Sequence, residues 1–144
     1  MLSGWLQATL VGVRFGLQFN PLAVLVGSSL AAALVGYPAA PRSRWLWAAV
    51  LLLGAWVIGD GVEVAASLPA GTISAHAAWT LALMVVVSLG VGFVLPAAAG
   101  AYVGRHVTRG TGWLSAFAVS AMLAGALIAI APVLSRAIAA RGGA

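Results

Sequence analysis

Residues 79–104 read WTLALMVVVSLGVGFVLPAAAGAYVG and contain no charged side chain. A helix needs about 20 predominantly apolar residues to cross the hydrocarbon core of a bilayer. The stretch belongs to a run of 41 residues between Glu63 and Arg105 that holds no acid, lysine or arginine. Because this run is too long for one span, its segment at 67–72, SLPAGT, is predicted to be a turn between two helices.

The whole chain shares this composition, since 63% of its 144 residues are hydrophobic and only 6% are charged. A typical soluble domain carries about 25% charged residues. Seven arginines, Asp60 and Glu63 are the only charged side chains, too few to coat a water-facing surface. These numbers exclude a soluble globular domain and a disordered chain, and the scattered arginines exclude an ordinary nucleic-acid-binding protein.

The charged residues divide the chain into apolar segments, and we predict an all-α, polytopic membrane protein with a single transmembrane domain over residues 1–144. Helices are expected because the segments are too long and too uniformly apolar for the strands of a barrel. Pro96 and Pro132 lie inside two of the segments and are predicted to kink them. Four spanning helices are expected at about 21–39, 45–67, 76–103 and 112–134.

Local signals mark the ends of the first span. Asn20 followed by Pro21 suits a helix N-cap and a first-turn proline, whereas Pro38 and Pro41 should end the helix. Before this span, residues 3–18 carry a polar stripe on one helical face. The stripe has two interpretations, an interfacial amphipathic helix or a long tilted first helix that brings the stripe into the bundle. Its residues are Ser3, Gln7, Arg14 and Gln18.

The arginines also predict an orientation. The loops after the first and third spans each carry two arginines, and short basic loops face the cytoplasm. Both termini are therefore expected outside. Arginine without lysine, together with abundant Ala, Gly and Val, is typical of a bacterial genome of high GC content, so we expect a bacterial inner-membrane protein. The four loop arginines are Arg42, Arg44, Arg105 and Arg109.

Small residues recur every four positions in three of the predicted spans. Such stripes let helix backbones approach closely in lipid. They predict tight packing within the chain, oligomers, or docking on a larger membrane subunit. The stripes are Ser28, Ala32 and Gly36 in the first span, Gly100 and Gly104 in the third, and Ala121, Gly125 and Ala129 in the fourth.

The two acids stand three residues apart, so they occupy neighbouring positions on one helix face. With four crossings, Asp60, Glu63, Arg14, His76 and Arg136 all fall on the same side of the membrane. We hypothesise a polar cluster there, in which Arg14 or Arg136 pairs with one of the acids. Two alternatives stay open, because the acids could instead be solvated boundary residues or could couple to proton or ion movement.

No pattern in the sequence predicts catalysis, a metal or a cofactor. The nucleophile-elbow, Walker, HExxH and GxGxxG motifs are all missing, and so is cysteine. His76 and His106 stand at opposite ends of one predicted span, about 45 Å apart, so they cannot bind one haem or metal ion within a monomer. The chain is expected to be neither an enzyme nor a cofactor protein.

These observations favour a small accessory or structural subunit of a membrane complex, or a homo-oligomer. Its partners would be the lipid bilayer and other membrane subunits or further copies of itself. The alternative is a small proton- or cation-coupled transporter or channel that uses Asp60 and Glu63. The two differ in one feature: a transporter needs an acid that faces an aqueous cavity between helices.

Overall fold

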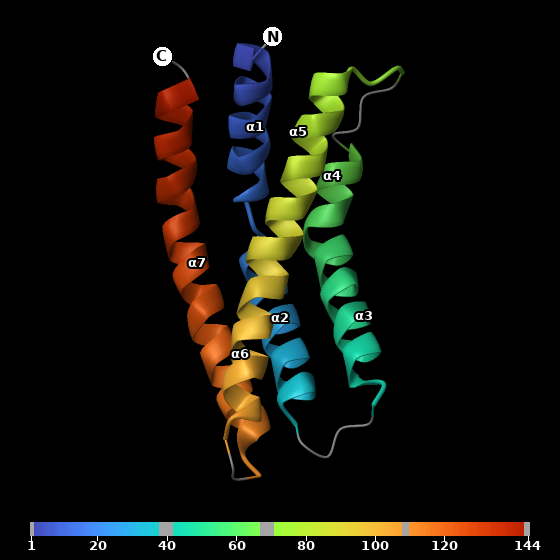
Figure 1. The fold of residues 1–144 in the computed structure, drawn as a ribbon, viewed down its shortest axis with the longest axis vertical. Coiled ribbons are helices and arrows are strands. Elements are labelled where there is room, and N and C mark those ends of the chain that lie inside the picture. Colours follow the sequence, from blue (N-terminus) through green and yellow to red (C-terminus); the bar gives the residue numbers. More distant parts are fainter. Residues whose placement is uncertain (1, 38–41, 67–70, 108–109, 143–144) are drawn as a thin grey trace.

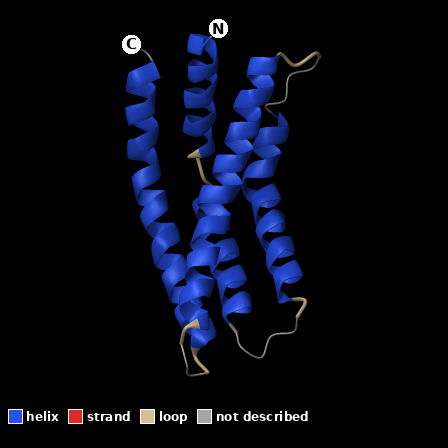
Figure 2. Ribbon diagram, viewed as in Figure 1, coloured by secondary structure: helices blue, strands red, loops and turns tan. Residues whose placement is uncertain are grey.

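The computed structural model describes residues 2–37, 42–66, 71–107 and 110–142. Within these ranges the chain is helical apart from short turns and contains no strand, which confirms the predicted all-α membrane fold (Figure 2). Two segments, η1 and η2, are π-helical, with a wider turn than an α-helix. The elements are α1 (Leu2–Gly16), α2 (Pro21–Gly36), α3 (Arg44–Trp56), η1 (Val57–Gly61), α4 (Val62–Ala66), α5 (Ala75–Val86), η2 (Val87–Val94), α6 (Leu95–Arg105) and α7 (Gly112–Gly142).

Three continuous helices of the described chain are long and apolar enough to cross a membrane, namely Arg44–Ala66, Ala75–Arg105 and Gly112–Gly142. They match the second, third and fourth predicted spans, although the last helix continues beyond residue 134. The pair α1 and α2 qualifies as a fourth span only when taken together, and it is bent by 78° at its break. The bundle therefore has three to four spanning helices.

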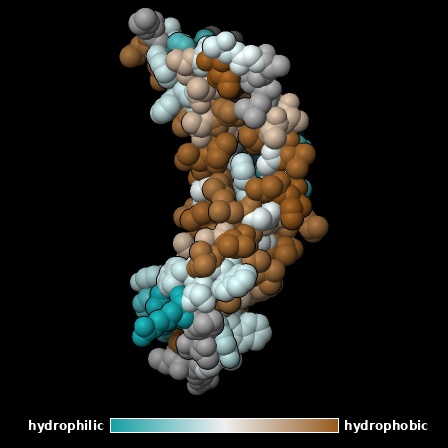
Figure 3. Space-filling model, turned by 90° about the vertical axis from the view of Figure 1, so that its right-hand side faces the viewer, coloured by the Kyte–Doolittle hydropathy of each residue, from teal (hydrophilic) through white to brown (hydrophobic). Residues whose placement is uncertain are grey.

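The helices form an upright bundle whose two chain ends lie at the same end (Figure 1). The end of α4 and the start of α5 lie at this end too. At the opposite end lie the end of α2, the start of α3, the end of α6 and the start of α7. On the face seen in Figure 3, hydrophobic surface dominates the middle and the hydrophilic side chains lie nearer the ends. This distribution is that of a helical bundle surrounded by lipid.

The N-terminal helix α1 carries the predicted polar stripe on its exposed face, and it packs along α5 and α7 (Figure 1). Three small residues, Ala8, Gly12 and Gly16, form its buried face. A Cβ atom on Gly12 would lie 2.7 Å from the backbone oxygen of Thr80 on α5, so the two helices are in backbone contact there. The interfacial placement of α1 stays a prediction.

The break between α1 and α2 begins after Gly16 and ends at the predicted N-cap. Asn20 is extended, and its Oδ1 accepts a hydrogen bond from the Ala23 backbone N–H at 3.2 Å. Pro21 follows in the first turn, where a backbone N–H has no partner within the helix, so proline loses no hydrogen bond there. The Asn20–Pro21 signal is thereby confirmed. The helix ends at Gly36; Pro38 and Pro41 lie outside the described residues, as do residues 67–70 of the predicted turn at 67–72.

The N-cap gives a first testable prediction. Replacing Asn20 with alanine should lower the free energy of unfolding by about 1 kcal/mol, because the start of α2 loses its side-chain acceptor. Asn20→Ser should keep most of that stability, since serine caps about as well. Thermal unfolding in one detergent, followed by size-exclusion chromatography, compares the two variants. Equal stabilities for the alanine and serine variants would contradict the role of the cap.

Pro96 lies in the first turn of α6, directly after η2. A proline ring collides with the carbonyl four residues earlier in a regular α-helix. The wider π turn over Val87–Val94 relieves that collision, so the span stays one continuous helix from Ala75 to Arg105. The sequence predicts that Pro96 kinks this span; the structure instead has a π segment directly before it within a continuous helix. The last helix continues through Pro132.

The tightest packing joins α2, α6 and α7. A Cβ atom on Gly100 would lie against the Ala116 backbone oxygen, 2.8 Å from the Ser120 Cβ and 3.1 Å from the Ala32 Cβ. Two predicted stripes thus lie in the contact, since Ser28, Ala32, Gly36, Gly100 and Gly104 are all buried. The small side chains let three backbones approach closely enough for dispersion contacts to hold the helices together in lipid.

The third predicted stripe does not pack within the described bundle. A side chain on Gly125 would meet nothing within 4 Å, and Ala129 is exposed. The face of α7 that packs is displaced by one position and also repeats every four residues. It comprises Gly112, Ala116, Ser120 and Ala124. Alanine and glycine are so frequent in this helix that their spacing alone does not distinguish the two faces.

Candidate functional site

Asp60 is the one buried charged residue of the described chain, with 6% of its surface exposed. It lies in η1, where that segment passes the break between α1 and α2. Its Oδ1 accepts a hydrogen bond from the Asn20 backbone N–H at 3.0 Å. On its other side, the Ser88 hydroxyl of η2 lies 3.5 Å from Oδ2. The carboxylate thus links the broken first span to both π segments.

Glycines make this junction possible. A Cβ atom on Gly59 would lie 2.6 Å from the Ala23 Cβ and 3.2 Å from the Asn20 Cβ. Real Cβ atoms do not approach so closely, so only glycine lets η1 lie against the start of α2. On the opposite side of the break, a Cβ on Gly92 would lie 2.7 Å from the Phe19 ring. Side chains of the break and of the start of α2 therefore pack closely on the Gly59 and Gly92 backbones of η1 and η2.

A second hydrogen bond orders the hydroxyl that faces Asp60. The Trp56 indole Nε1–H, one turn before Asp60, donates to the Ser88 Oγ at 2.9 Å. With its oxygen occupied as an acceptor, the Ser88 hydroxyl is free to point its own proton at the carboxylate. Trp56, Ser88 and Asp60 form a short polar chain across an otherwise apolar contact. Their neighbours are the buried Phe93, Val24 and Ala124.

A cavity of about 210 Å³ adjoins Asp60. This volume has room for a few water molecules. Ligand pockets for drug-sized molecules are larger, at roughly 300–1,000 Å³. The cavity therefore suits a proton carried by water, or a small cation. Gln18 and Glu63 line it with exposed side chains, and Ser88 lies deeper beside Asp60. The rest of its wall is apolar and consists of Phe15, Val64 and Met84.

The polar cluster predicted from the sequence is divided among four places. Asp60 and Glu63 share the cavity. Arg14 lines a hollow between α1 and α7, and Arg136 lines a separate hollow between α7 and the break after α1. His76 begins α5 and stacks on Trp5 of α1, with 4.6 Å between ring centroids. No ion pair joins either acid to an arginine within the described ranges, where Asp60 meets Asn20 and Ser88 instead.

The partners of Asp60 could not be predicted from the sequence, because a backbone N–H carries no sequence signal. Ser88 stands 28 residues away in a helix whose facing side depends on its π turns. The spacing of Trp56 identifies it as a neighbour of Asp60, but not its hydrogen bond to Ser88. Spacing also assigns Gln18 to the polar stripe of α1, whereas the break brings it to the cavity.

The oxygen atoms around the cavity define what it can bind. Carboxylate, hydroxyl and amide oxygens are ligands for hard cations, whereas transition metals favour His and Cys. Across the part of the chain that the structure describes, no three His, Cys, Asp or Glu side chains gather as a metal site. The donors here are Asp60, Glu63, Ser88 and Gln18, which fit a proton or a monovalent cation better than zinc or haem.

No protein-family model, curated protein or solved structure matches the chain.

Proposed function

We propose that the protein binds a proton or a small monovalent cation at Asp60 and moves it across the bacterial inner membrane. The protein acts as a small transporter or channel rather than as an enzyme. Its termini lie outside, and the arginine-bearing connections lie in the cytoplasm. Glu63 stands nearer the surface, at the exposed edge of the cavity.

One observation carries this proposal: a buried carboxylate in an apolar bundle that has no arginine partner within the described residues. A charged carboxylate away from water is costly unless it is paired, protonated or bound to a cation. Hydrogen bonds from Asn20 and Ser88 offset part of that cost. Uptake of a proton or a cation by Asp60 offsets the rest of the cost of its burial.

The discontinuous first span supports the same proposal. Transporters commonly place their ion sites at helices that are broken inside the membrane, where a half-helix end meets the ion-binding group. Here α2 begins beside Asp60, and π segments of two other helices enclose the junction. π segments inside long helices occur frequently at functional sites.

Proton or cation flux into vesicles tests the proposal. The purified protein is reconstituted into liposomes that contain a pH-sensitive dye, and a potassium diffusion potential is then imposed. The wild-type protein should acidify the lumen, or should admit sodium when the proton gradient is absent. Asp60→Asn should reduce the rate at least about tenfold, because the neutral amide keeps the shape but loses a charge interaction worth about 1.4 kcal/mol or more.

Glu63→Gln is the matched control, since it also removes one carboxylate charge. Glu63 is exposed, so its loss should change the rate by less than about threefold. The thermal stability of both variants shows that they fold. Wild-type flux in the Asp60→Asn variant, with wild-type stability, would refute the proposal.

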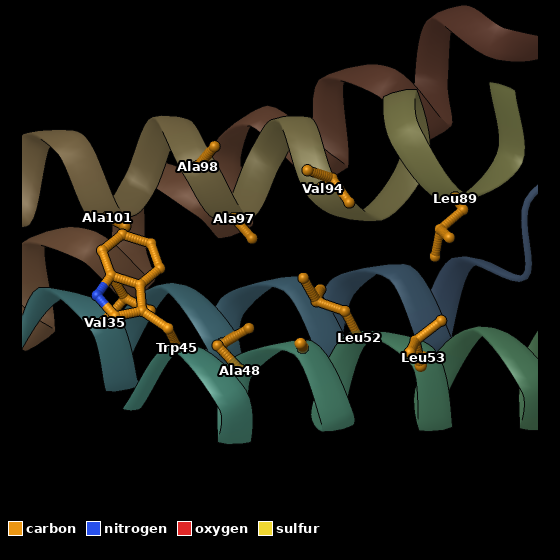
Figure 4. Close-up of a pocket in the computed structure, with 12 residues that line it drawn as sticks. Val35, Trp45, Ala48, Leu52, Leu53, Leu89, Val94, Ala97, Ala98 and Ala101 are labelled. Carbon is orange, nitrogen blue, oxygen red and sulfur yellow. The ribbon is translucent and has the colours of Figure 1, made fainter. Parts of the chain in front are cut away.

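An accessory role is a second candidate, favoured by an apolar groove of about 330 Å³ between α3 and α6. Figure 4 shows Leu52 and Leu53 of α3 facing the side of Leu89 and Ala97, with alanines along much of the groove. Such a surface accepts a partner helix or a lipid chain. The mass of the intact particle, purified from its host in mild detergent, distinguishes the two functions, because an accessory subunit should copurify with larger subunits.

A further inference from the structure

A second polar region is the cleft that α7 forms with α1 and with the break after α1, and it consists of two hollows. Gln18 lines one of these hollows as well as the Asp60 cavity. One hollow of about 360 Å³ is lined by Arg14 and Gln7, together with the apolar Leu10 and Ile138. A second, of about 410 Å³, is lined by Arg136, Gln18 and Ser135, together with the apolar Leu17 and Ile128. Each hollow thus combines a guanidinium with amide or hydroxyl groups and an aliphatic wall.

The cleft has a positive charge that no neighbouring acid balances. Neither Arg14 nor Arg136 forms an ion pair with any residue in the described ranges; Arg14 lies over the Phe15 ring, 5.8 Å from its centroid. Both acids of the chain line the other cavity instead. A guanidinium in each hollow of the cleft favours an anionic ligand, and its planar donors suit phosphate oxygens.

The depth of the cleft matches that of lipid headgroups. Arg136 stands 24 residues after Gly112, the first residue of α7, and therefore about 36 Å further along the helix axis. The hydrocarbon core of a bilayer is about 30 Å thick. A helix that enters the core near Gly112 therefore brings Arg136 to the opposite interface, where phospholipid phosphates lie.

We infer that this cleft binds an anionic phospholipid. The guanidinium groups of Arg14 and Arg136 attract its anionic headgroup, the side chains of Gln7, Gln18 and Ser135 offer hydrogen bonds, and its acyl chains lie along the apolar walls of the two hollows. Basic pockets between transmembrane helices are known binding sites for anionic headgroups. The hollows are also larger than a free phosphate ion requires, and part of their lining is apolar, which favours a lipid. This inference does not depend on Asp60.

Native mass spectrometry tests the inference with the full chain in detergent. Delipidated protein is titrated with phosphatidylglycerol or with phosphatidylcholine. The wild type should bind one phosphatidylglycerol at least tenfold more tightly than phosphatidylcholine. Arg14→Gln/Arg136→Gln should weaken phosphatidylglycerol binding by about thirtyfold, because each basic group at a membrane surface contributes about a factor of five. Arg14→Lys/Arg136→Lys keeps the charge and should retain most of the affinity, which also reports that the cleft tolerates substitution.

Arg42→Gln/Arg105→Gln is the matched control, since it removes the same charge from exposed residues at the other end of the bundle. It should leave the high-affinity lipid in place. Equal losses in the two glutamine variants would show diffuse attraction and overturn the site. Equal affinity for both lipids would overturn it too. Displacement of phosphatidylglycerol by millimolar inorganic phosphate would show that the cleft binds a free anion, and it would overturn the inference that the ligand is a lipid.

Discussion

Gly100→Leu should destroy the packing of α2, α6 and α7. Its Cβ atom alone would collide with the Ala116 backbone oxygen and would lie 2.8 Å from the Ser120 Cβ. Neither contact can yield without moving a helix, because both belong to the body of α7. Overpacking typically costs 1–3 kcal/mol, and a collision with backbone is at the upper end, so we expect a loss of about 3 kcal/mol or more. The midpoint of thermal loss of the monodisperse size-exclusion peak measures it.

Gly125→Leu is the control for this variant. It adds the same side chain to a helical glycine, but nothing lies within 4 Å of the new Cβ atom. Leucine also favours a helix over glycine by nearly 1 kcal/mol, so the variant should be as stable as the wild type or slightly more so. If Gly125→Leu were the more damaging of the two, the α7 face that packs in the structure would be the wrong one.

Gly59→Ala should reduce flux about tenfold or more while leaving Asp60 in the chain. The added methyl would lie 2.6 Å from the Ala23 Cβ, so η1 must move away from the start of α2. The Asn20 N–H then no longer reaches Oδ1, which it now meets at 3.0 Å. Loss of a hydrogen bond to a charged group corresponds to about tenfold or more in rate. The same vesicle flux assay that tests Asp60→Asn measures this effect.

A compensating substitution distinguishes loss of the contact between residues 59 and 23 from general damage to the fold. Gly59→Ala/Ala23→Gly moves the methyl from one helix to the other and should restore flux to within about threefold of the wild type. Gly54→Ala adds a methyl in the same span with nothing within 4 Å and should leave flux unchanged. The role of the junction would be refuted if the double variant were as inactive as the single one, given that both fold.

The packing stripes illustrate how far sequence reasoning reaches. Spacing alone identifies Gly100 and Gly104 as contact residues, and they do lie against α7. The same reasoning selects Gly125, which meets nothing within 4 Å. In a helix this rich in small residues, several faces satisfy the same spacing rule. Which of these faces packs depends on the surface of the partner helix as well as on that of α7.

The π segments limit the prediction of the site in a similar way. Spacing places Asp60 and Glu63 on neighbouring positions of one face, yet Asp60 is buried and Glu63 is exposed. Asp60 lies in η1, and an extra residue in a turn rotates the residues after it by roughly 100° relative to a regular helix. Helical phase counted from the sequence is therefore unreliable beyond such a turn.

The order of the residues is enough to establish that this chain belongs in lipid, where its apolar segments begin and end, and which ends of the bundle lie together. These properties arise from transfer of side chains out of water, which adds up residue by residue along the chain. The folded bundle alone reveals that Asp60 meets the Asn20 backbone and Ser88 instead of an arginine. That pairing depends on how a broken helix and two π segments orient their groups in space. Unlike the transfer free energies, this orientation cannot be obtained by adding contributions from single residues.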